Sequence, residues 1–441
     1  MTTADLLLAP EGTGTGHPGP TLLRLATAGS VDDGKSTLIG RLLHDTKSVF
    51  ADQLASVEAA SRQRGWKGEL ADLALLTDGL RAEREQGITI DVAYRYFATA
   101  ERSYVLADTP GHVQYTRNTV TGASTADVVV VLVDARNGVV EQTRRHLAIS
   151  ALLRVPHVLV ALNKIDLVDD PQAVHAAVTA ELGRVADSLA LRDLHVVPVS
   201  ALHGDNVVTR SERTAWYEGP TLLALLETLP PGADQREGDL RLPVQLVIRP
   251  QHGAVDPAHV DYRGYAGLIT SGTVALGDPI TVAGSGRSTT VTGIDVAGSP
   301  VERAAAGLSV TLSLADELDI SRGDVLAGGT VPVPTDSTAA VLCCLSETPL
   351  RERARVLVKH GTRTVQARVQ GISERLDIES LETVPADTAE LNDLVQVQLQ
   401  LAEALPLEPY AATRDGGSFL VIDPQSGTTL AAGMVQADLR A

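Results

Sequence analysis

The chain has 441 residues, of which 44% are hydrophobic, and its formal net charge at pH 7 is −18. This length exceeds what one hydrophobic core usually serves, so we expect about two or three domains. The sequence holds no run of about 18 apolar residues, which a membrane-spanning helix needs, and its negative charge opposes attraction to nucleic acid phosphates. We therefore expect a multidomain protein with no membrane partner and no nucleic acid partner.

The N-terminal segment, residues 1–20, is rich in Gly, Thr and Pro. It lacks the basic start and the sustained apolar core of a signal peptide, so we expect a mobile tail on a cytoplasmic protein. The two cysteines, Cys343 and Cys344, are adjacent in a strand-like run. Because alternate strand positions face opposite sides, we expect one thiol on each face and a packing role for both.

A glycine-rich segment, GSVDDGKS at residues 29–36, follows the apolar, strand-like run at residues 22–28. It fits the pattern G-x-x-x-x-G-K-[ST], whose glycines let successive backbone N–H groups turn inward around a β-phosphate. In this pattern Lys35 reaches the β- and γ-phosphates, and the Ser36 hydroxyl binds Mg²⁺. The segment therefore predicts a nucleoside triphosphate site.

Two further motifs identify the nucleotide as GTP. DTPGH at residues 108–112 supplies Asp108, which can hold Mg²⁺ through water, and Gly111, whose N–H can meet the γ-phosphate. In NKID, residues 163–166, the Asp166 carboxylate would accept two hydrogen bonds from guanine that adenine does not offer. The pair of motifs therefore predicts a guanine nucleotide with its magnesium ion.

Ser200 and Ala201 are predicted to close the base pocket through backbone N–H groups that meet the guanine oxygen. This dipeptide, DTPGH and NKID each follow a predicted parallel strand, at residues 195–199, 103–107 and 157–162. Ligands of doubly wound sheets bind at the carboxyl ends of the strands, so the order and spacing of the motifs carry the prediction.

A threonine between these motifs is a candidate nucleotide switch. Thr89 lies in REQGITID, residues 84–91. Its hydroxyl can join the Mg²⁺ shell, and its N–H can touch the γ-phosphate only while that phosphate is present. Arg84 and Arg117 lie near the predicted switch segments, but surface salt bridging explains them equally well, so neither is assigned a catalytic role.

The order of predicted helices and strands divides the chain into a mixed α/β part and an all-β part. Residues 21–230 alternate strand-like and helical stretches, which predicts an α/β P-loop GTPase domain with a mostly parallel sheet and helices on both faces. A linker rich in Pro, Gly and charge follows at residues 231–239. Short β-rich runs separated by glycine turns then predict two small β-barrel domains, at residues 240–330 and 338–441.

One local segment of the second barrel is basic. RERARVLVKHGTR, residues 351–363, alternates basic and apolar residues. This alternation favours the solvated face of a strand, and the alternative is a surface that faces an acidic partner.

The longer sequence runs resemble one family. The GIT core around Thr89 is shared with the translational GTPases. The sequence around these motifs is more specific than the superfamily pattern. It resembles the GTPase subunit of bacterial sulfate adenylyltransferase, the larger partner in heteromeric ATP sulfurylase. The resemblance covers nearly everything from residue 22 onward, and it is carried by residues 75–97, 108–127, 134–146, 217–223, 261–267, 316–326 and 416–435.

This resemblance implies a subunit that hydrolyses GTP beside a smaller subunit, which transfers the adenylyl group of ATP to sulfate. It implies that His112 orients the attacking water, while Lys35 neutralises charge and Thr89 completes the catalytic set. Many relatives carry an adenylylsulfate kinase domain, but this sequence has no second G-x-x-x-x-G-K-[ST], so we do not expect kinase activity from it.

The sequence therefore defines a set of candidate site residues. The predicted catalytic residues are His112, Lys35 and Thr89, and the predicted magnesium ligands are Ser36, Thr89 and Asp108. The predicted GTP-binding residues are Gly29, Ser30, Val31, Asp32, Asp33, Gly34, Lys35, Ser36, Thr37, Asp108, Thr109, Pro110, Gly111, His112, Asn163, Lys164, Ile165, Asp166, Ser200 and Ala201.

Two other functions stay open at this point. The first is a translation-elongation type of GTPase that delivers a charged tRNA through its barrels, although the negative charge weakens it. The second is a GTPase module of a dedicated sulfation pathway in place of cysteine biosynthesis, which sequence cannot separate from the leading prediction.

Overall fold

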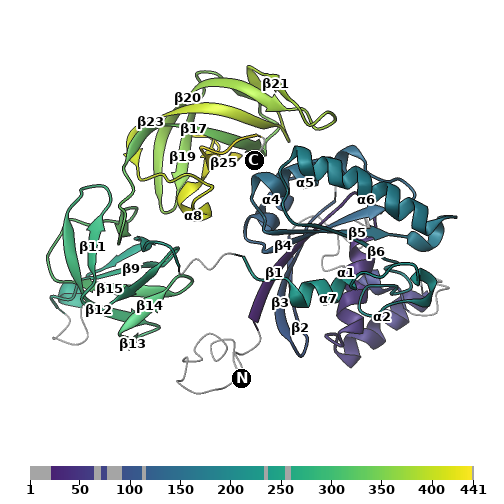
Figure 1. The fold of residues 1–441 in the computed structure, drawn as a ribbon. Coiled ribbons are helices and arrows are strands. Elements are labelled where there is room, and N and C mark those ends of the chain that lie inside the picture. Colours follow the sequence, from purple (N-terminus) through teal and green to yellow (C-terminus); the bar gives the residue numbers. More distant parts are fainter. Residues whose placement is uncertain are drawn as a thin grey trace.

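The computed structural model describes residues 21–63, 71–76, 92–111, 116–232, 237–253 and 260–439. It contains an α/β domain followed by two all-β domains (Figure 1). The predicted fold class, a P-loop GTPase domain followed by two small β-barrels, is confirmed. The predicted tail at residues 1–20 lies outside the described residues.

The α/β domain is built on a six-stranded sheet in the order β2-β3-β1-β4-β5-β6. All neighbouring pairs are parallel except β2 with β3, which is antiparallel. The strands are β1 (Thr21–Ala28), β2 (Ala93–Ala98), β3 (Arg102–Asp108), β4 (Val128–Asp134), β5 (His157–Asn163) and β6 (Leu194–Pro198). The helices are α1 (Lys35–Asp45), α2 (Ala51–Gln63), α4 (Thr116–Ser124), α5 (Glu141–Leu152), α6 (Pro171–Ser188) and α7 (Leu222–Thr228).

Strand β4 is buried along its whole length and shows how the sheet receives helices on both sides. Because side chains alternate along a strand, Val129, Val131 and Val133 pack in the cluster that includes α4, α5 and α6. Val128 and Val130 pack in the other cluster, which includes α1 and α7. Figure 1 shows the two helix layers on opposite faces of the sheet.

The middle all-β domain is a sheet that curls back on itself and has a core of its own. The strand path is β7-β16-β11-β12-β15-β9-β8, and a bridge between Arg241 and Ser271 brings the β7 end beside the chain that follows β9. Its strands are β7 (Arg241–Pro243), β8 (Leu246–Ile248), β9 (Gly264–Leu268), β10 (Thr273–Ala275), β11 (Pro279–Val282), β12 (Ser288–Val296), β13 (Ser299–Pro300), β14 (Arg303–Ala305), β15 (Ser309–Leu314) and β16 (Val325–Ala327).

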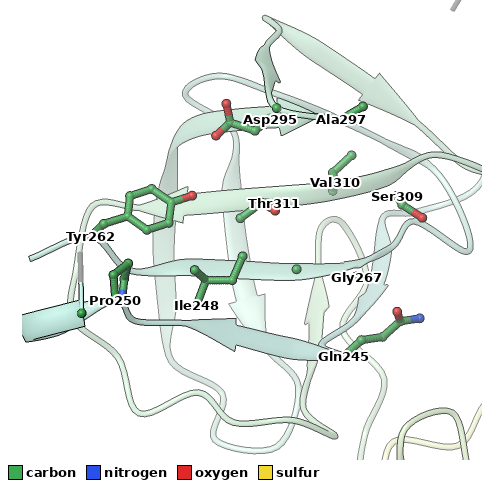
Figure 2. A pocket seen from close by; sticks show the side chains of 13 residues that line it. Gln245, Ile248, Pro250, Tyr262, Gly267, Asp295, Ala297, Ser309, Val310 and Thr311 are labelled. Atoms are coloured by element: carbon green, nitrogen blue, oxygen red, sulfur yellow. The ribbon is translucent and has the colours of Figure 1, made fainter. Parts of the chain in front are cut away.

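A groove of about 790 Å³ lies on this middle barrel, along strands β8, β9 and β15 (Figure 2). Its described lining includes Ile248, Tyr262 and Val310, and Asp295 is the one charged residue in it. The chain that follows Gly253, at residues 254–259, lies outside the described residues.

The C-terminal all-β domain is a closed barrel of six strands in the order β19-β24-β25-β17-β23-β20, with β20 pairing back to β19. These strands are β17 (Thr335–Cys344), β19 (Arg355–His360), β20 (Arg363–Leu376), β23 (Leu394–Leu405), β24 (Ser418–Ile422) and β25 (Thr429–Val435). The shorter elements are β18 (Leu350–Arg351), β21 (Thr383–Pro385), β22 (Thr388–Ala389) and α8 (Arg414–Gly417).

The two cysteines at the end of β17 are free and buried, as a packing role requires. Cys344 packs inside the C-terminal barrel, whereas Cys343 belongs to the cluster that includes α4, α5 and α6. One apolar cluster therefore joins the α/β domain to the outer face of the C-terminal barrel, whose interior has a core of its own. Burial raises the pKa of the Cys343 thiol to about 12, so both its position and its protonation suit packing.

Polar contacts reinforce this junction between the α/β domain and the C-terminal barrel. Arg117 on α4 donates to the carbonyls of Leu345 (3.2 Å) and Thr429 (2.9 Å), and the Tyr410 hydroxyl donates to the Leu153 carbonyl (3.1 Å). Arg117, which the sequence placed near a switch, therefore binds the barrel in this structure. Among the described residues, none of the helices is long and apolar enough to span a membrane.

Candidate nucleotide-binding site

The glycine-rich loop joins β1 to α1, and its backbone takes conformations that favour glycine. Gly29 has φ 148° and Gly34 has φ 91°. A methyl group built on Gly34 would lie 2.5 Å from Asn163 Nδ2, and one on Gly29 would lie 3.0 Å from the Leu132 carbonyl oxygen. The loop therefore fits only with glycine at both positions, and it directs its chain toward the start of α1.

Lys35, the first residue of α1, folds back over this loop. Its Nζ donates to the carbonyl oxygens of Gly29 (2.7 Å) and Ser30 (2.8 Å). Burial lowers the pKa of Lys35, while the carboxylates of Asp33, Asp108 and Asp32 act in the opposite direction. A buried ammonium held by two neutral carbonyls gains from an anionic ligand, so Lys35 suits contact with phosphate.

The DTPGH segment lies against the same loop. A methyl group on Gly111 would lie 2.2 Å from Lys35 Nζ and 2.5 Å from the Gly29 carbonyl oxygen. Asp108, the last residue of β3, is buried, and Thr27 Oγ1 donates to its carboxylate (3.3 Å). Gly111 therefore touches the lysine that is predicted to hold the γ-phosphate.

Asn163 ties the glycine-rich loop to the predicted base pocket. Its Nδ2 donates to the Asp33 carbonyl (2.7 Å), and its Oδ1 accepts from the backbone N–H of Ala201 (2.9 Å). The N–H of Ser200 donates to the Asp205 carbonyl (3.2 Å). Both N–H groups that we predicted to meet the guanine oxygen therefore have partners within the protein, so a base at this position has to share or replace them.

Asp134 is a site residue that the sequence reasoning missed. It ends β4 directly beside Asn163, accepts a bidentate pair of bonds from Arg136 (2.6 and 3.0 Å), and lies 2.9 Å from Lys164 Nζ. These partners hold the pKa of Asp134 well below its usual range. Lys164 also donates to the Asp32 carbonyl, so Asp134 anchors a lysine that binds the glycine-rich loop. The available signal was a carboxylate at the carboxyl end of a predicted parallel strand.

Asp166, the predicted guanine-binding carboxylate, is left open to a ligand. The one basic side chain within ion-pair distance in the described part of the chain is His203, whose Nε2 lies 3.7 Å from Asp166 Oδ2. Ile165 beside it is buried, and Lys164 precedes it with φ 61°. The buried neighbour and the turn fix the position of Asp166, while its carboxylate oxygens stay available for donors on a base.

A second missed residue, His146 on α5, is buried within electrostatic reach of Lys35. Gln142 Nε2 donates to His146 Nε2 (3.2 Å), and Nδ1 has no hydrogen-bond partner in the described part of the chain. Burial, and then the charges of Lys35 and Arg145, lower the pKa of His146 to about 3. A neutral imidazole therefore lies behind the phosphate-binding lysine.

The structure brings most of the predicted set together at the carboxyl edge of the sheet. The described members are Gly29, Ser30, Val31, Asp32, Asp33, Gly34, Lys35, Ser36, Thr37, Asp108, Thr109, Pro110, Gly111, Asn163, Lys164, Ile165, Asp166, Ser200 and Ala201. Thr89 and His112 lie outside the described residues, so the structure places neither the predicted switch threonine nor the predicted water-orienting histidine.

Two parts of the chain match known domain families. Residues 21–231 match the Elongation factor Tu GTP binding domain, and residues 337–436 match the GTP-eEF1A C-terminal domain-like family. Together with the loop, Lys35 and the NKID segment, these matches define a GTP-binding protein of the elongation factor Tu class.

Relatives along nearly the whole chain define the family more closely. The chain is 50% identical over 424 residues to the bifunctional enzyme CysN/CysC of Mycobacterium tuberculosis, an alignment that covers 96% of the chain and 68% of that protein. It is 48% identical to sulfate adenylyltransferase subunit 1 of Methylorubrum populi, over 95% of the chain and 88% of the relative. It is 45% identical to the protein of the same name from Cellvibrio japonicus, over 96% and 89%.

The chain therefore belongs to the sulfate adenylyltransferase subunit 1 family. This outcome confirms the resemblance inferred from the sequence and favours it over the translation-factor alternative, since these relatives are named for sulfate adenylyltransferase.

Proposed function

We propose that this chain is the GTP-hydrolysing subunit of a sulfate adenylyltransferase and couples GTP hydrolysis to the formation of adenosine 5′-phosphosulfate in a smaller partner subunit. In that reaction a sulfate oxygen attacks the α-phosphorus of ATP, the bond to the β-phosphate breaks, and pyrophosphate leaves. The proposal places the chain in sulfate assimilation, as the first step toward cysteine, in the cytoplasm.

The observation that carries this proposal is the contact between Gly111 and the loop that holds Lys35. A γ-phosphate bonded to Lys35 has to lie beside the backbone of Gly111, so its loss on hydrolysis changes the surroundings of the DTPGH segment. Helix α4 follows that segment, and its Arg117 binds the C-terminal barrel. A change at the γ-phosphate can therefore reach the junction with the C-terminal barrel and alter the surface that the chain offers to a partner.

The residues at the site fit GTP with magnesium. Ser36, at the start of α1, is partly exposed and has no side-chain hydrogen bond within the described part of the chain, and Asp108 is a buried carboxylate beside Thr27. Such oxygens suit Mg²⁺, and the ion, when bound, neutralises charge on the β- and γ-phosphates. We propose Ser36, Thr89 and Asp108 as its ligands or water-mediated holders, and His112 as the residue that positions the water.

The chain's own residues then divide the work. Lys35 holds the β- and γ-phosphates, Gly111 senses the γ-phosphate, and Asp166 selects guanine. Asn163 holds the phosphate loop and the base pocket in fixed positions relative to each other, because its side chain bonds to both. We propose that the domains divide at residues 231–239 and just before β17 (Thr335–Cys344), which belongs to the C-terminal barrel although we predicted that barrel to begin at residue 338. This division assigns nucleotide binding to residues 21–230.

The test is GTP hydrolysis by the purified chain, alone and with the adenylyl-transferring subunit, ATP and sulfate. We expect slow hydrolysis alone and a clear rise in rate only when all three additions are present. An unchanged rate, with complex formation demonstrated by sedimentation, would contradict the coupling. Addition of aminoacyl-tRNA in place of the subunit serves as the control for the translation alternative and is expected to change nothing.

A further inference from the structure

The outer face of the C-terminal barrel carries a row of polar side chains across neighbouring strands. Arg355 on β19 lies directly opposite Arg368 on β20, and Arg368 lies opposite Gln400 on β23. Gln400 in turn lies opposite Ser337 on β17. Two guanidinium groups on adjacent strands therefore begin a row that crosses four strands.

The two arginines are placed unfavourably for the isolated chain. Like charges directly opposite each other on antiparallel strands are destabilising. Both residues are exposed, and neither guanidinium has a hydrogen bond or an ion pair within the ranges that the structure describes. By contrast, Arg363 on the same strand pairs with Glu403 at 2.7 Å. The fold itself therefore gives no reason for the pair.

A groove of about 570 Å³ runs along this row. Its polar lining consists of Arg355, Arg368, Gln366, Gln370 and Gln400, and its described lining contains no carboxylate and no aromatic ring. Gln370 donates to Gln400 (3.1 Å), and Gln400 donates to the Asp336 carbonyl (2.9 Å), so these amides are held in place. We call this surface the basic groove.

The basic groove differs in charge from the groove on the middle barrel. That groove, shown in Figure 2, has Asp295 and no cation in its described lining. The chain as a whole carries a formal charge of −18, so a groove lined by two arginines has the opposite sign to the molecule as a whole. This local reversal of charge attracts an acidic ligand to the groove, although the net charge of the molecule is negative.

We propose that the basic groove docks an acidic segment of the partner subunit. This inference rests on the proposed function, because that function requires a second protein. Strands lie about 4.8 Å apart, so the row from Arg355 to Gln400 spans roughly 10 Å, the length of about three extended residues. Carboxylates spaced along an extended peptide can pair with both guanidinium groups, while the glutamines bond to its backbone.

The groove chemistry favours a peptide over RNA. Binding of single-stranded nucleic acid uses a track of cations together with aromatic rings on which bases stack. The basic groove offers two arginines and no ring in its described lining. We therefore assign it to a protein partner, and RNA becomes an outcome that the experiment can reveal.

The test compares the wild-type chain with Arg355→Gln/Arg368→Gln in titration calorimetry against the purified adenylyl-transferring subunit at several salt concentrations. We expect the double variant to bind about 10-fold more weakly at low salt and to show a smaller dependence on salt, because two charge pairs are lost. GTP affinity should stay unchanged, and the melting temperature should stay the same or rise, since the like-charge contact is removed. The matched control is Arg287→Gln, an exposed arginine on the middle barrel that is expected to bind like the wild type.

Each result decides the proposal. Equal affinity of the double variant and the wild type would overturn the docking assignment and leave the proposed function standing. Absence of any binding by the wild type would overturn both. If tRNA binds the wild type but not the double variant, while subunit binding is unaffected, the groove is an RNA surface and the proposal is wrong.

Discussion

The phosphate end and the base end of the nucleotide site are built in different ways. At the phosphate end, glycine backbone at Gly29 and Gly34 fixes a loop around one buried cation, Lys35. At the base end, Asn163 bonds to the backbone of Asp33 and Ala201, Asp134 pairs with Lys164, and Asp166 is left open. The phosphate end therefore depends on shape and one charge, and the base end depends on the identity of a single carboxylate. Substitutions at the first should remove binding, and those at the second should redirect it.

The largest expected effect is at the phosphate end, with Lys35→Ala. Loss of charge-assisted hydrogen bonds, worth about 1.5–3 kcal/mol each, should weaken GTP binding by roughly 100-fold or more. Calorimetry with GTP and magnesium measures it. The variant should keep or raise its melting temperature, because a buried ammonium is removed. Arg62→Ala, at an exposed position on α2, is the control. Wild-type affinity in Lys35→Ala would show that the loop does not hold the phosphates.

The difference between the two ends also explains what the sequence could and could not predict. The glycine-rich loop and the NKID segment are local patterns, so the strands, their carboxyl edge and the candidate residues follow from them. Asp134 reaches Lys164 because strand pairing places β4 beside β5, and no local sequence pattern predicts that contact. The register of the sheet places it there, and register is a tertiary property.

The sequence likewise does not reveal which hydrogen-bond partner or packing neighbour a residue finds in the folded chain. The N–H of Ala201 bonds to Asn163 because two loops approach each other, whereas the dipeptide pattern predicts a bond to the base. Cys343 was predicted to face away from Cys344, which the structure bears out, but the alternation rule does not say which domain supplies the neighbours of Cys343. Packing between domains joins residues hundreds of positions apart, and composition carries no record of it.

At the base end, Asp166→Asn should redirect binding. The amide presents a donor where the carboxylate accepted, so affinity for guanosine nucleotides should fall by about 100-fold and xanthosine nucleotides should bind better than in the wild type. Competition of both triphosphates against a fluorescent guanosine nucleotide measures the shift. Asp169→Asn, an exposed neighbour, should leave both affinities unchanged. Retained preference for guanine would place the base elsewhere and remove the distinction between the two ends.

The smallest expected effect concerns acid stability at the phosphate end. The folded-state pKa of His146, about 3, lies below the ordinary value of about 6.5. Between these values the unfolded chain binds a proton that the folded chain does not, so the free energy of unfolding falls as pH decreases from about 7 to 5, by about 2 kcal/mol for this group. His146→Gln should flatten that slope in urea denaturation at a series of pH values. His203→Gln, at the base end with a 41% exposed side chain, should retain the wild-type slope. Equal slopes in all three proteins would mean that the buried imidazole does not determine how the free energy of unfolding depends on pH. The two ends of the site would then not differ in acid stability.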